Sequence, residues 1–537
     1  MVKYEVMTAP TTVKPVGVQI LDTKWTFDVK TDREGHLIRY KARLVLRGFL
    51  MRYLEHYRKT YSPTAFKESV RLILYLITAC KFHQFLFDVK VAFLHGIIDN
   101  NNIWLKYPAG MPGWIDGIEQ YCRLLKALYG SKQASLIFYE FLCDKLPQLG
   151  YTQSINDPCL WFRRDEQDRL SVLCTHVDDI PGCSQDPNEA QRLAVGLVQF
   201  FEISFKPVIE KLLGVLVYLN EPNKLVAYND IYFDEAVESM AQLGIVNLQP
   251  RQTMGAPMAR YVPNTTGQAP KQMHEAYRSL IGTLIWPAIN WKPDICHKVG
   301  QLGRFVNNPS FEHLDAAIEV LEYCLATKYW GICFMKPALY EVPQPLQLCL
   351  FAQADADWSK DWDSVSVSGN QLSIHFPAEI NQFKKTFIPP KFNLLQWSAT
   401  KQADHVADST ESAETYSCNT MCNHIEWGRN LLEELQILYP TPTYLANDNQ
   451  SNIINIKEGR VTAKARHNAR KFANVRKQSR QKKVDLVYVT SEELVPDWYT
   501  KVVDNTTNKR HRASTMDEAN IGKRKKARLS SQPGNTH

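Results

Sequence analysis

The sequence predicts an α+β protein built from several domains, and three observations lead to this class. At 537 residues the chain is too long for a single hydrophobic core. Its hydrophobic share of 45% and aromatic share of 11% are typical of folded globular proteins. Segments with the alternation of strands and segments with the spacing of helices follow one another along the chain, so neither element type accounts for it alone.

The first half of the chain begins with strands. Residues 17–60 alternate between polar and apolar side chains, and "DREGH" within them supplies the acids and glycine of a hairpin turn. Residues 68–82 and 132–149 carry apolar side chains at helical spacing. Between these two helices, "HQFLFDVKVAFLHG" predicts a buried strand that runs into a helix. Further along, "LSVLCTHVDDIPGC" predicts a hairpin of two strands.

The second half is expected to change character twice. A helix over 188–201 and strands around "KLLGVLVYLN" are followed by a mostly helical pattern between 225 and 345. A new apolar strand at "LQLCLFAQADADW" opens the last folded unit. From residue 505 onward the chain is polar and charged and has no apolar period, which predicts a disordered tail.

The charge distribution favours a polyanionic partner. The net charge is +7, and residues 460–483 contain ten lysines and arginines but no acid. Contact with the phosphates of a nucleic-acid duplex is the favoured interpretation of this run, and a solvated charged helix is the alternative. Two tail clusters, "KRHR" at 509–512 and "KRKKAR" at 523–528, resemble a bipartite nuclear import signal.

Other features predict an intracellular protein of the nucleus or cytoplasm. The N-terminus lacks an apolar leader, and no apolar run is long enough to span a membrane. Twelve cysteines are scattered without a C-x-x-C pair, as in proteins whose thiols stay reduced. Cys418, Cys422 and His424 are too close together to form a zinc site on their own.

Three acids form the first candidate site. Asp88 ends a hydrophobic strand, and Asp178 and Asp179 lie on the predicted hairpin. Carboxylates on two adjacent strands would hold two Mg²⁺ about 4 Å apart, as nucleotidyl transfer requires. Taken by themselves, the paired acids Asp178 and Asp179 are better explained as solvated residues of a turn.

An ordered series of motifs extends this interpretation. "RYKARLVLRGF", "YSPTAFKESVRLIL", "FDVKVAFLHG", "LLKALYGSKQASLIFYEFL", "NDPCLWF" and "HVDDI" occur in this order, followed by "YRSLIGTL", "KPDICHKVGQLGRFVNNPSFEH", "QADADW", "STESAETY", "NDNQSNI" and "ELVPDWYTK". Together they resemble the reverse transcriptase and RNase H of copia-type long-terminal-repeat retrotransposons. Each motif is weak alone, whereas their order is specific.

The resemblance implies a right-hand-shaped polymerase followed by an RNase H-like α/β domain. It implies an N-terminal extension over 1–16, fingers and palm over 17–222, a thumb or connection over 223–345, an RNase H-like domain over 346–503 and a basic tail over 504–537. The implied activities are DNA synthesis on RNA or DNA templates and hydrolysis of RNA in RNA–DNA hybrids. Each site would use two Mg²⁺ or Mn²⁺ ions, and the partners would be template RNA, a DNA primer, hybrid duplex and deoxynucleoside triphosphates. Oligomeric state, primer and host stay open.

The resemblance also assigns residues to the polymerase site. Asp88, Asp178 and Asp179 take the metal-ligand positions. Lys41 and Arg43 would grip the triphosphate, although a solvated strand face explains them as well. Phe93 would exclude a 2′-hydroxyl, with a core phenylalanine as the alternative. The remaining residues match the loop that packs against template and nucleotide: Gly130, Lys132 and Gln133.

A second set of acids matches the metal ligands of RNase H. The resemblance assigns Asp355, Glu414, Asp448 and Asp497 to this site. Glu411 competes with Glu414 because "STESAETY" has one residue more than the family's motif, and counting back along the predicted helix favours Glu414. Asp357 is expected to lie outside the ligand set.

The chain departs from its family near the first site. His176 stands where the family has tyrosine, and a protonated imidazole there would compete with Mg²⁺ for the acids. The hairpin after the acids looks shortened, and Pro181 within it belongs at an edge or bulge. Ser135 replaces a proline, and Ala469 replaces an acid. With no protease motif or zinc-binding His/Cys set in the chain, these departures favour a rival class, a non-catalytic nucleic-acid-binding relic of such an element.

Overall fold

The computed structural model describes residues 4–31, 36–98, 102–255, 261–336, 340–358, 363, 365–383, 391–402, 407, 409–460 and 469–519. The chain divides into two compact units, Met1–Phe66 with His83–Val208, and Lys67–Phe82 with Ile209–His537. The first unit therefore ends before residue 222, where the sequence predicted the palm to end. Helix α1 (Lys67–Thr78), expected among the fingers and palm, groups with the second unit instead.

A six-stranded antiparallel sheet with the order β11-β4-β10-β9-β8-β7 forms the base of the first unit. Its strands are β4 (His83–Val89), β7 (Thr152–Gln153), β8 (Leu160–Arg164), β9 (Leu170–Cys174), β10 (Asp179–Ser184) and β11 (Ile203–Lys206). Helices α2 (Ala134–Lys145) and α3 (Glu189–Leu197) pack against one face, where Phe85 and Phe87 join a buried core. Because strand side chains alternate between faces, Asp88 lies on the face away from this core.

Pro181 corrects one expectation from the sequence. It lies inside β10, which is flanked by β4 and β9 rather than placed at an edge. Pairing with β4 begins at Asp179, opposite Asp88, whereas pairing with β9 begins only at Gly182, one residue after the proline. Pro181 has no N–H to donate, and it precedes the first residue of β10 that pairs with β9, so no hydrogen bond to β9 is lost. Although the hairpin looks shortened in the sequence, all six residues of β10 pair with β4.

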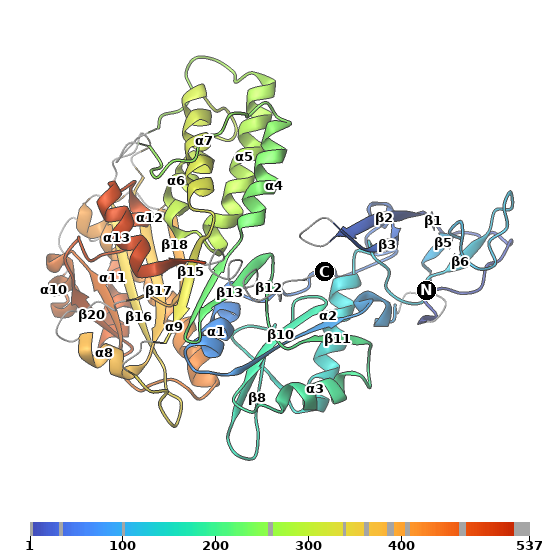
Figure 1. Cartoon of the computed structure of the whole chain (residues 1–537), viewed down its shortest axis with the longest axis horizontal. Helices are drawn as coiled ribbons and strands as arrows, with labels where there is room; N and C mark the ends of the chain where they lie inside the picture. Colours follow the sequence, from blue (N-terminus) through green and yellow to red (C-terminus); the bar gives the residue numbers. More distant parts are fainter. Residues whose placement is uncertain are drawn as a thin grey trace, which may run out of the picture. The chain divides into compact units, whose positions relative to one another are not determined.

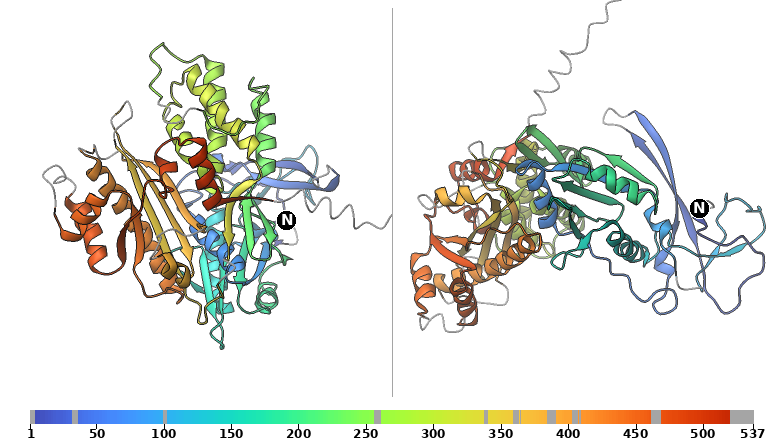
Figure 2. Two further views of the ribbon diagram at one scale, coloured as in Figure 1. Left: turned by 60° about the vertical axis from the view of Figure 1, so that its left-hand side comes forward. Right: turned by 90° about the horizontal axis from the view of Figure 1, so that it is seen from below.

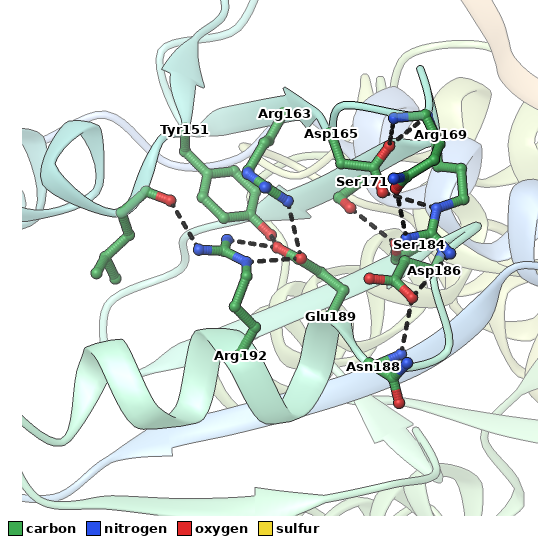
Figure 3. Close-up of polar contacts among 12 residues, drawn as sticks. Tyr151, Arg163, Asp165, Arg169, Ser171, Ser184, Asp186, Asn188, Glu189 and Arg192 are labelled. Atoms are coloured by element: carbon green, nitrogen blue, oxygen red, sulfur yellow. Dashed lines mark hydrogen bonds and ion pairs between the residues drawn. The ribbon is translucent and has the colours of Figure 1, made fainter.

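Buried charges attach α3 to this sheet (Figure 3). Glu189, at the start of α3, is fully buried and accepts hydrogen bonds from the Tyr151 hydroxyl at 2.7 Å and from Arg163 at 3.0 Å. Arg192, one turn further along the helix, donates to both oxygens of the same carboxylate at 2.6 and 2.8 Å. A buried carboxylate with this many donors is fully compensated, so the group serves the fold.

The rest of the first unit is a long two-stranded ribbon and a small sheet. The ribbon pairs β2 (Thr23–Thr31) with β3 (Leu37–Leu46) and is drawn in blue in Figure 2. The small sheet has the order β1-β5-β6, comprising β1 (Ile20–Leu21), β5 (Trp104–Lys106) and β6 (Tyr121–Arg123). The hairpin predicted for residues 17–60 is thus present, although most of its turn, residues 32–35, lies outside the described residues.

The second unit contains a five-stranded sheet, β12-β13-β14-β15-β21, and a group of helices that stand side by side in Figure 1. The helices are α4 (Asp230–Ala241), α5 (Lys271–Asn290), α6 (Cys296–Gly303) and α7 (Phe311–Ala326). The strands are β12 (Lys211–Leu212), β13 (Val215–Glu221), β14 (Lys224–Tyr228), β15 (Trp330–Met335) and β21 (Met516–Glu518). The helical pattern predicted between 225 and 345 is confirmed for the helices, while β14 and β15 within that range were missed.

A mixed sheet follows with the order β18-β17-β16-β19-β20. Its first three strands are antiparallel, and β19 and β20 run parallel to β16. The strands are β16 (Cys349–Asp357), β17 (Val367–His375), β18 (Leu394–Lys401), β19 (Thr443–Asn447) and β20 (Val484–Tyr488). The helices are α8 (Pro377–Phe383), α9 (Thr410–Glu434), α10 (Gln450–Glu458), α11 (Ala469–Arg480) and α12 (Asp497–Thr500). The two units together confirm the predicted α+β class.

The prediction of disorder from residue 505 is wrong for the described part of the tail. Helix α13 (Asn505–Thr515) and strand β21 follow α12, and β21 pairs with β15. The first basic cluster of the expected import signal lies inside α13, where His511 and Arg512 are buried. The second cluster lies outside the described residues. Within the described parts of the chain, no helix combines the length and apolarity needed to cross a membrane.

Candidate active sites

In the first unit, two of the three candidate acids form a cross-strand pair. Asp88 at the end of β4 and Asp179 at the start of β10 are direct partners across the two strands, so both side chains lie on the same face. Asp178 lies in the turn just before β10, and its carbonyl oxygen accepts a hydrogen bond from Val89 N at 2.7 Å. Ser204 on β11 donates its hydroxyl to Asp88 Oδ2 at 3.1 Å.

The turn that presents Asp178 is tight and strained. His176 and Asp179 exchange both backbone hydrogen bonds, at 2.8 and 3.0 Å, leaving only Val177 and Asp178 in the loop. Val177 has φ +54°, a left-handed conformation that is costly for a β-branched residue. Such strain persists only where surrounding structure imposes it, and it is often found at functional sites. Here it holds Asp178 at the tip of the hairpin.

Burial, together with the like charges around this turn, raises the pKa of the acids. Burial, then Asp178 and Asp88, raises the pKa of Asp179 to about 6. Partial desolvation and the negative charge of Asp88 also raise the pKa of Asp178. Since acids that repel one another are stabilised by a cation and offer hard oxygen donors, this set fits Mg²⁺ or Mn²⁺.

His176 behaves differently from the sequence-based expectation. Burial lowers the pKa of its imidazole below the ordinary 6.5, and the opposing effect of Asp178 is smaller. Burial thus disfavours the charged imidazole, which argues against the competition between a charged histidine and Mg²⁺ that was expected from the sequence.

A cation and two rings stand next to the acids. Arg43 on β3 lies 5.8 Å from the centroid of the Tyr129 ring, and Tyr129 meets Phe93 edge-on at 5.0 Å. Burial raises the pKa of Tyr129; Asp178 and Asp88 raise it further, whereas Arg43 lowers it. Lys41 lies two residues earlier on β3, opposite Asp28 in the ribbon. The sequence missed Tyr129, although it directly precedes the glycine of the predicted loop.

That loop closes against the end of β3. Gly130 has φ +85°, and a Cβ there would lie 2.2 Å from the Leu46 carbonyl oxygen, so only glycine fits. Lys132 is exposed, whereas Gln133 is buried and donates to the His56 carbonyl at 3.3 Å. A pocket of about 650 Å³ opens beside the loop, and its lining includes two cations that the sequence did not single out, Lys24 and Arg47.

The second unit gathers its four acids more tightly. Asp355 lies on β16, Glu414 on α9 and Asp448 directly after β19, and their carboxylate oxygens lie within 4.8 Å of one another. Asp497, the first residue of α12, lines the same pocket of about 440 Å³. Glu411 lies outside this pocket and accepts a hydrogen bond from Asn455 at 2.8 Å, so the structure brings Glu414 and not Glu411 to the other acids. Asp357 also lines the pocket.

Each acid of this cluster has a donor that orients it. Thr500 donates to Asp355 Oδ2 at 2.6 Å, Asn447 to Glu414 Oε2 at 2.8 Å and Ser491 to Asp448 Oδ2 at 2.5 Å. Lys501 forms an ion pair with Asp497 Oδ1 at 2.8 Å. Because each donor engages one oxygen, further lone pairs stay available to a cation.

Because the cluster is largely buried, keeping its carboxylates ionised costs free energy unless a positive charge lies nearby. Burial raises the pKa of Asp355 to about 8, with Asp497 as the next cause, and raises the pKa of Glu414 well above its ordinary range. Burial likewise raises the pKa of Asp497. Four oxygen-bearing acids at one pocket, with Lys501 as the nearby cation, fit a divalent ion such as Mg²⁺ or Mn²⁺.

The basic run near this site is only partly described. Helix α11 starts at Ala469, and Lys471 Nζ lies 3.7 Å from the centroid of the Tyr416 ring on α9. Lys483 is engaged by Glu426 at 2.9 Å. Within the basic run 460–483, Arg466 lies outside the described residues, while Arg470 and Lys477 belong to α11.

Comparison with known proteins indicates the class of protein to which the chain is similar. Residues 2–244 match the family described as reverse transcriptase (RNA-dependent DNA polymerase). Over 498 residues the chain is 27% identical to the retrovirus-related Pol polyprotein from transposon TNT 1-94 of Nicotiana tabacum, covering 91% of this chain and 35% of that protein. It is 28% identical over 498 residues to the corresponding polyprotein from transposon RE1 of Arabidopsis thaliana, covering 92% and 31%. The predicted resemblance to copia-type retrotransposon Pol proteins is therefore confirmed, and the chain spans about a third of the length of these relatives.

Among solved structures, the chain is similar to a foamy viral protease-reverse transcriptase in complex with double-stranded DNA. The identity is 10%, the TM-score is 0.45, and the match covers 91% of this chain and 68% of that one.

Proposed function

We propose that the chain synthesises DNA on RNA or DNA templates at the first acid set and cleaves the RNA strand of hybrids at the second. The observation that carries the first half is the pairing of Asp88 with Asp179, with Asp178 on the adjoining turn, inside the segment that matches the reverse transcriptase family. The convergence of Asp355, Glu414 and Asp448 supports the second half.

At the first set, Asp88, Asp178 and Asp179 would hold two divalent ions. Bound Mg²⁺ lowers the pKa of an attacking hydroxyl and balances phosphate charge. Arg43 and Lys41 would bind the triphosphate of the incoming nucleotide through charge-assisted hydrogen bonds. Phe93, braced edge-on by Tyr129, would fill the space that a 2′-hydroxyl needs.

At the second set, hydrogen-bond donors would hold the carboxylates in the orientation that binds a metal ion. Thr500 and Asn447 keep Asp355 and Glu414 in fixed rotamers, so the carboxylates need little rearrangement when an ion binds. Lys501 balances part of the negative charge and lies where a scissile phosphate would also be attracted. The basic helix α11 would neutralise phosphates of the hybrid duplex further along.

The domain roles follow this division. Fingers and palm would lie within residues 17–222, thumb or connection within 223–345 and the nuclease within 346–503. Template RNA, DNA primer, RNA–DNA hybrid and deoxynucleoside triphosphates are the proposed partners. A location in the nucleus or cytoplasm stays a prediction, and burial of His511 and Arg512 in α13 speaks against 509–512 as an accessible import signal.

The rival function is nucleic-acid binding without DNA synthesis. The observation in its favour is His176, whose smaller ring replaces the family's tyrosine directly beside the acids. A paired assay on one preparation separates the two: extension of a DNA primer on an RNA template, and cleavage of an RNA–DNA hybrid, each with Mg²⁺ and with chelator. The proposal expects both activities and their loss with chelator. Binding of hybrid without either activity would establish the rival.

For the nuclease half, Asp448→Asn is the test variant and Glu411→Gln its matched control. Both remove one negative charge near α9 and α10, but only Asp448 belongs to the acid cluster. We expect Asp448→Asn to abolish hybrid cleavage while Glu411→Gln retains it. Equal loss in both variants would contradict the assignment of the cluster.

A further inference from the structure

Helix α13 is attached to the short helix α12 that carries Asp497. Trp498 Nε1, on α12, donates a hydrogen bond to Asn508 Oδ1, on α13, at 2.8 Å. The Trp498 ring also meets His511 edge-on, with centroids 5.8 Å apart. The three side chains are at most 5% exposed, so this contact is a buried one.

The other side of α13 is attached to α7 and β15. Asn508 Nδ2 donates to the Tyr323 hydroxyl at 3.5 Å, and Arg512 donates to the same oxygen at 3.4 Å. The Arg512 guanidinium lies 4.5 Å from the centroid of the Trp330 ring. Asn508 thus uses its two amide atoms to connect α12 with α7.

Helix α12 depends on such contacts for its position. It has only four residues, and a single helical turn is not stable by itself. On one side it packs against β17, where a Cβ at Gly369 would lie 2.6 Å from the Pro496 carbonyl oxygen and 2.8 Å from Thr500 Cγ2. It also contacts α6, where His297 Nδ1 lies 3.1 Å from the Tyr499 carbonyl oxygen, and α13 through Trp498.

Two residues of α12 act in the acid cluster. Asp497 lines the pocket, and Thr500 donates to Asp355. A shift or rotation of α12 would therefore move one acid and release the donor that orients another. Displacements well below the length of a hydrogen bond are enough to weaken metal coordination.

We propose that α13 is a positioning element of the nuclease site, which acts through the hydrogen bond between Asn508 and Trp498 to set the affinity of the acid cluster for its divalent cation. This rests on the proposed nuclease function. Asn508 is a positioning residue, because it touches neither the acids nor a substrate.

The test measures metal binding directly, by electron paramagnetic resonance of Mn²⁺ titrated into the full-length chain. A background of Asp88→Asn, Asp178→Asn and Asp179→Asn removes the three candidate acids of the first unit from the titration. Asn508→Ala removes both bonds of the amide. Trp498→Phe removes the indole N–H with the five-membered part of the ring but keeps an aromatic ring at this position, so it stays informative where Asn508→Ala fails to fold.

Asn229→Ala is the matched control. Asn229 is also a buried asparagine of the second unit with two hydrogen bonds, to Tyr232 N at 3.0 Å and to the Gly214 carbonyl at 2.7 Å, and it lies at the start of α4. We expect Asn508→Ala and Trp498→Phe each to weaken Mn²⁺ binding about tenfold, with no further loss in the double variant, while Asn229→Ala binds like the parent.

Mn²⁺ binding by Asn508→Ala and Trp498→Phe equal to that of Asn229→Ala would overturn the role of α13 and leave the nuclease proposal standing. A parent that neither binds Mn²⁺ at this cluster nor cleaves hybrids would overturn the proposed nuclease function, and the role of α13 with it. Hybrid cleavage at saturating Mn²⁺ should recover in both variants, which a collapsed site would not allow.

Discussion

The two acid sets of this chain differ in how far the fold prepares them. In the second unit, three carboxylates lie within 4.8 Å of one another and each accepts a hydrogen bond from a fixed donor. In the first unit, Asp178 is exposed on a hairpin tip. Asp88 accepts a hydrogen bond from the Ser204 hydroxyl. The nuclease-like site is thus organised before an ion arrives.

The difference has a physical reason in the elements used. Strand ends and two helices surround the second set and bury Asp355, Glu414 and Asp497, so these carboxylates have little freedom to move. The first set relies on a two-residue turn with Val177 in a left-handed conformation. We infer that bound ions and nucleotide bring the acids of the first set into their final geometry. At the second set, the acids already have this geometry before an ion binds.

The largest expected effect separates the two sets. Asp178→Asn removes a charge needed to hold the ions, so DNA synthesis should fall roughly a thousandfold or more while hybrid cleavage stays unchanged. Primer extension and hybrid cleavage on the same preparation measure this. Asp168→Asn, in the turn between β8 and β9, is the control and should leave both activities intact. Loss of both activities in an Asp178→Asn protein that melts like the wild type would refute two independent sites.

Selectivity for deoxynucleotides is expected to change next most. Phe93→Ala removes the ring that would block a 2′-hydroxyl, so the preference for deoxynucleotides over ribonucleotides should fall about 10- to 100-fold. Single-nucleotide incorporation with both substrates measures the ratio. An unchanged ratio, with extension still measurable, would show that Phe93 is only a core residue.

A stability effect tests the attachment of α13 to the second unit. Burial lowers the pKa of His511 to about 3, so between pH 6.5 and 3 the unfolded chain binds a proton that the folded chain does not. Stability is therefore fully present above pH 6.5 and declines as the pH falls, by about 2 kcal/mol from this group at pH 5. Urea unfolding of the wild type and of His511→Leu at pH 7 and pH 5 isolates the contribution. An identical pH dependence in both would contradict the burial of His511.

The smallest expected effect concerns the ring beside the first set. His176→Tyr restores the family's larger ring and should raise extension by roughly threefold to tenfold through added contact with the primer end. Because burial keeps the imidazole neutral at and above pH 7, the gain should be the same at pH 7 and pH 8.5. A gain that disappears as the pH rises would instead indicate a charged histidine.

Local patterns predicted most of the elements that carry the acids. Strand β4, the hairpin of β9 and β10, and strand β16 follow from local patterns of neighbouring residues. The six-residue pairing of β10 with β4 was not predictable, because a proline such as Pro181 argues against a central strand. Whether β10 can be central depends on the residue at which its pairing with β9 begins, which the sequence does not show. Ring and cation neighbours such as Tyr129 come from a chain segment distant from the acids, so only the fold reveals them.

The tail shows the limit of local reasoning most clearly. Asn505–Glu518 has the composition of a disordered segment, yet β21 completes a sheet that begins at Lys211. Its stabilising contacts, among them Trp498, Tyr323 and Trp330, lie up to 189 residues away in the sequence. Contacts of this kind leave no period in the segment itself.

Extension of a DNA primer on a homopolymer RNA template by the purified wild-type chain tests the central claim most directly. We expect extension that requires Mg²⁺ or Mn²⁺ and deoxynucleoside triphosphates, together with cleavage of the hybrid that forms. Absence of extension by both the wild type and His176→Tyr, in a preparation that still cleaves RNA–DNA hybrids, would contradict it. Asp88, Asp178 and Asp179 would then be the remnant of a polymerase site beside a working nuclease.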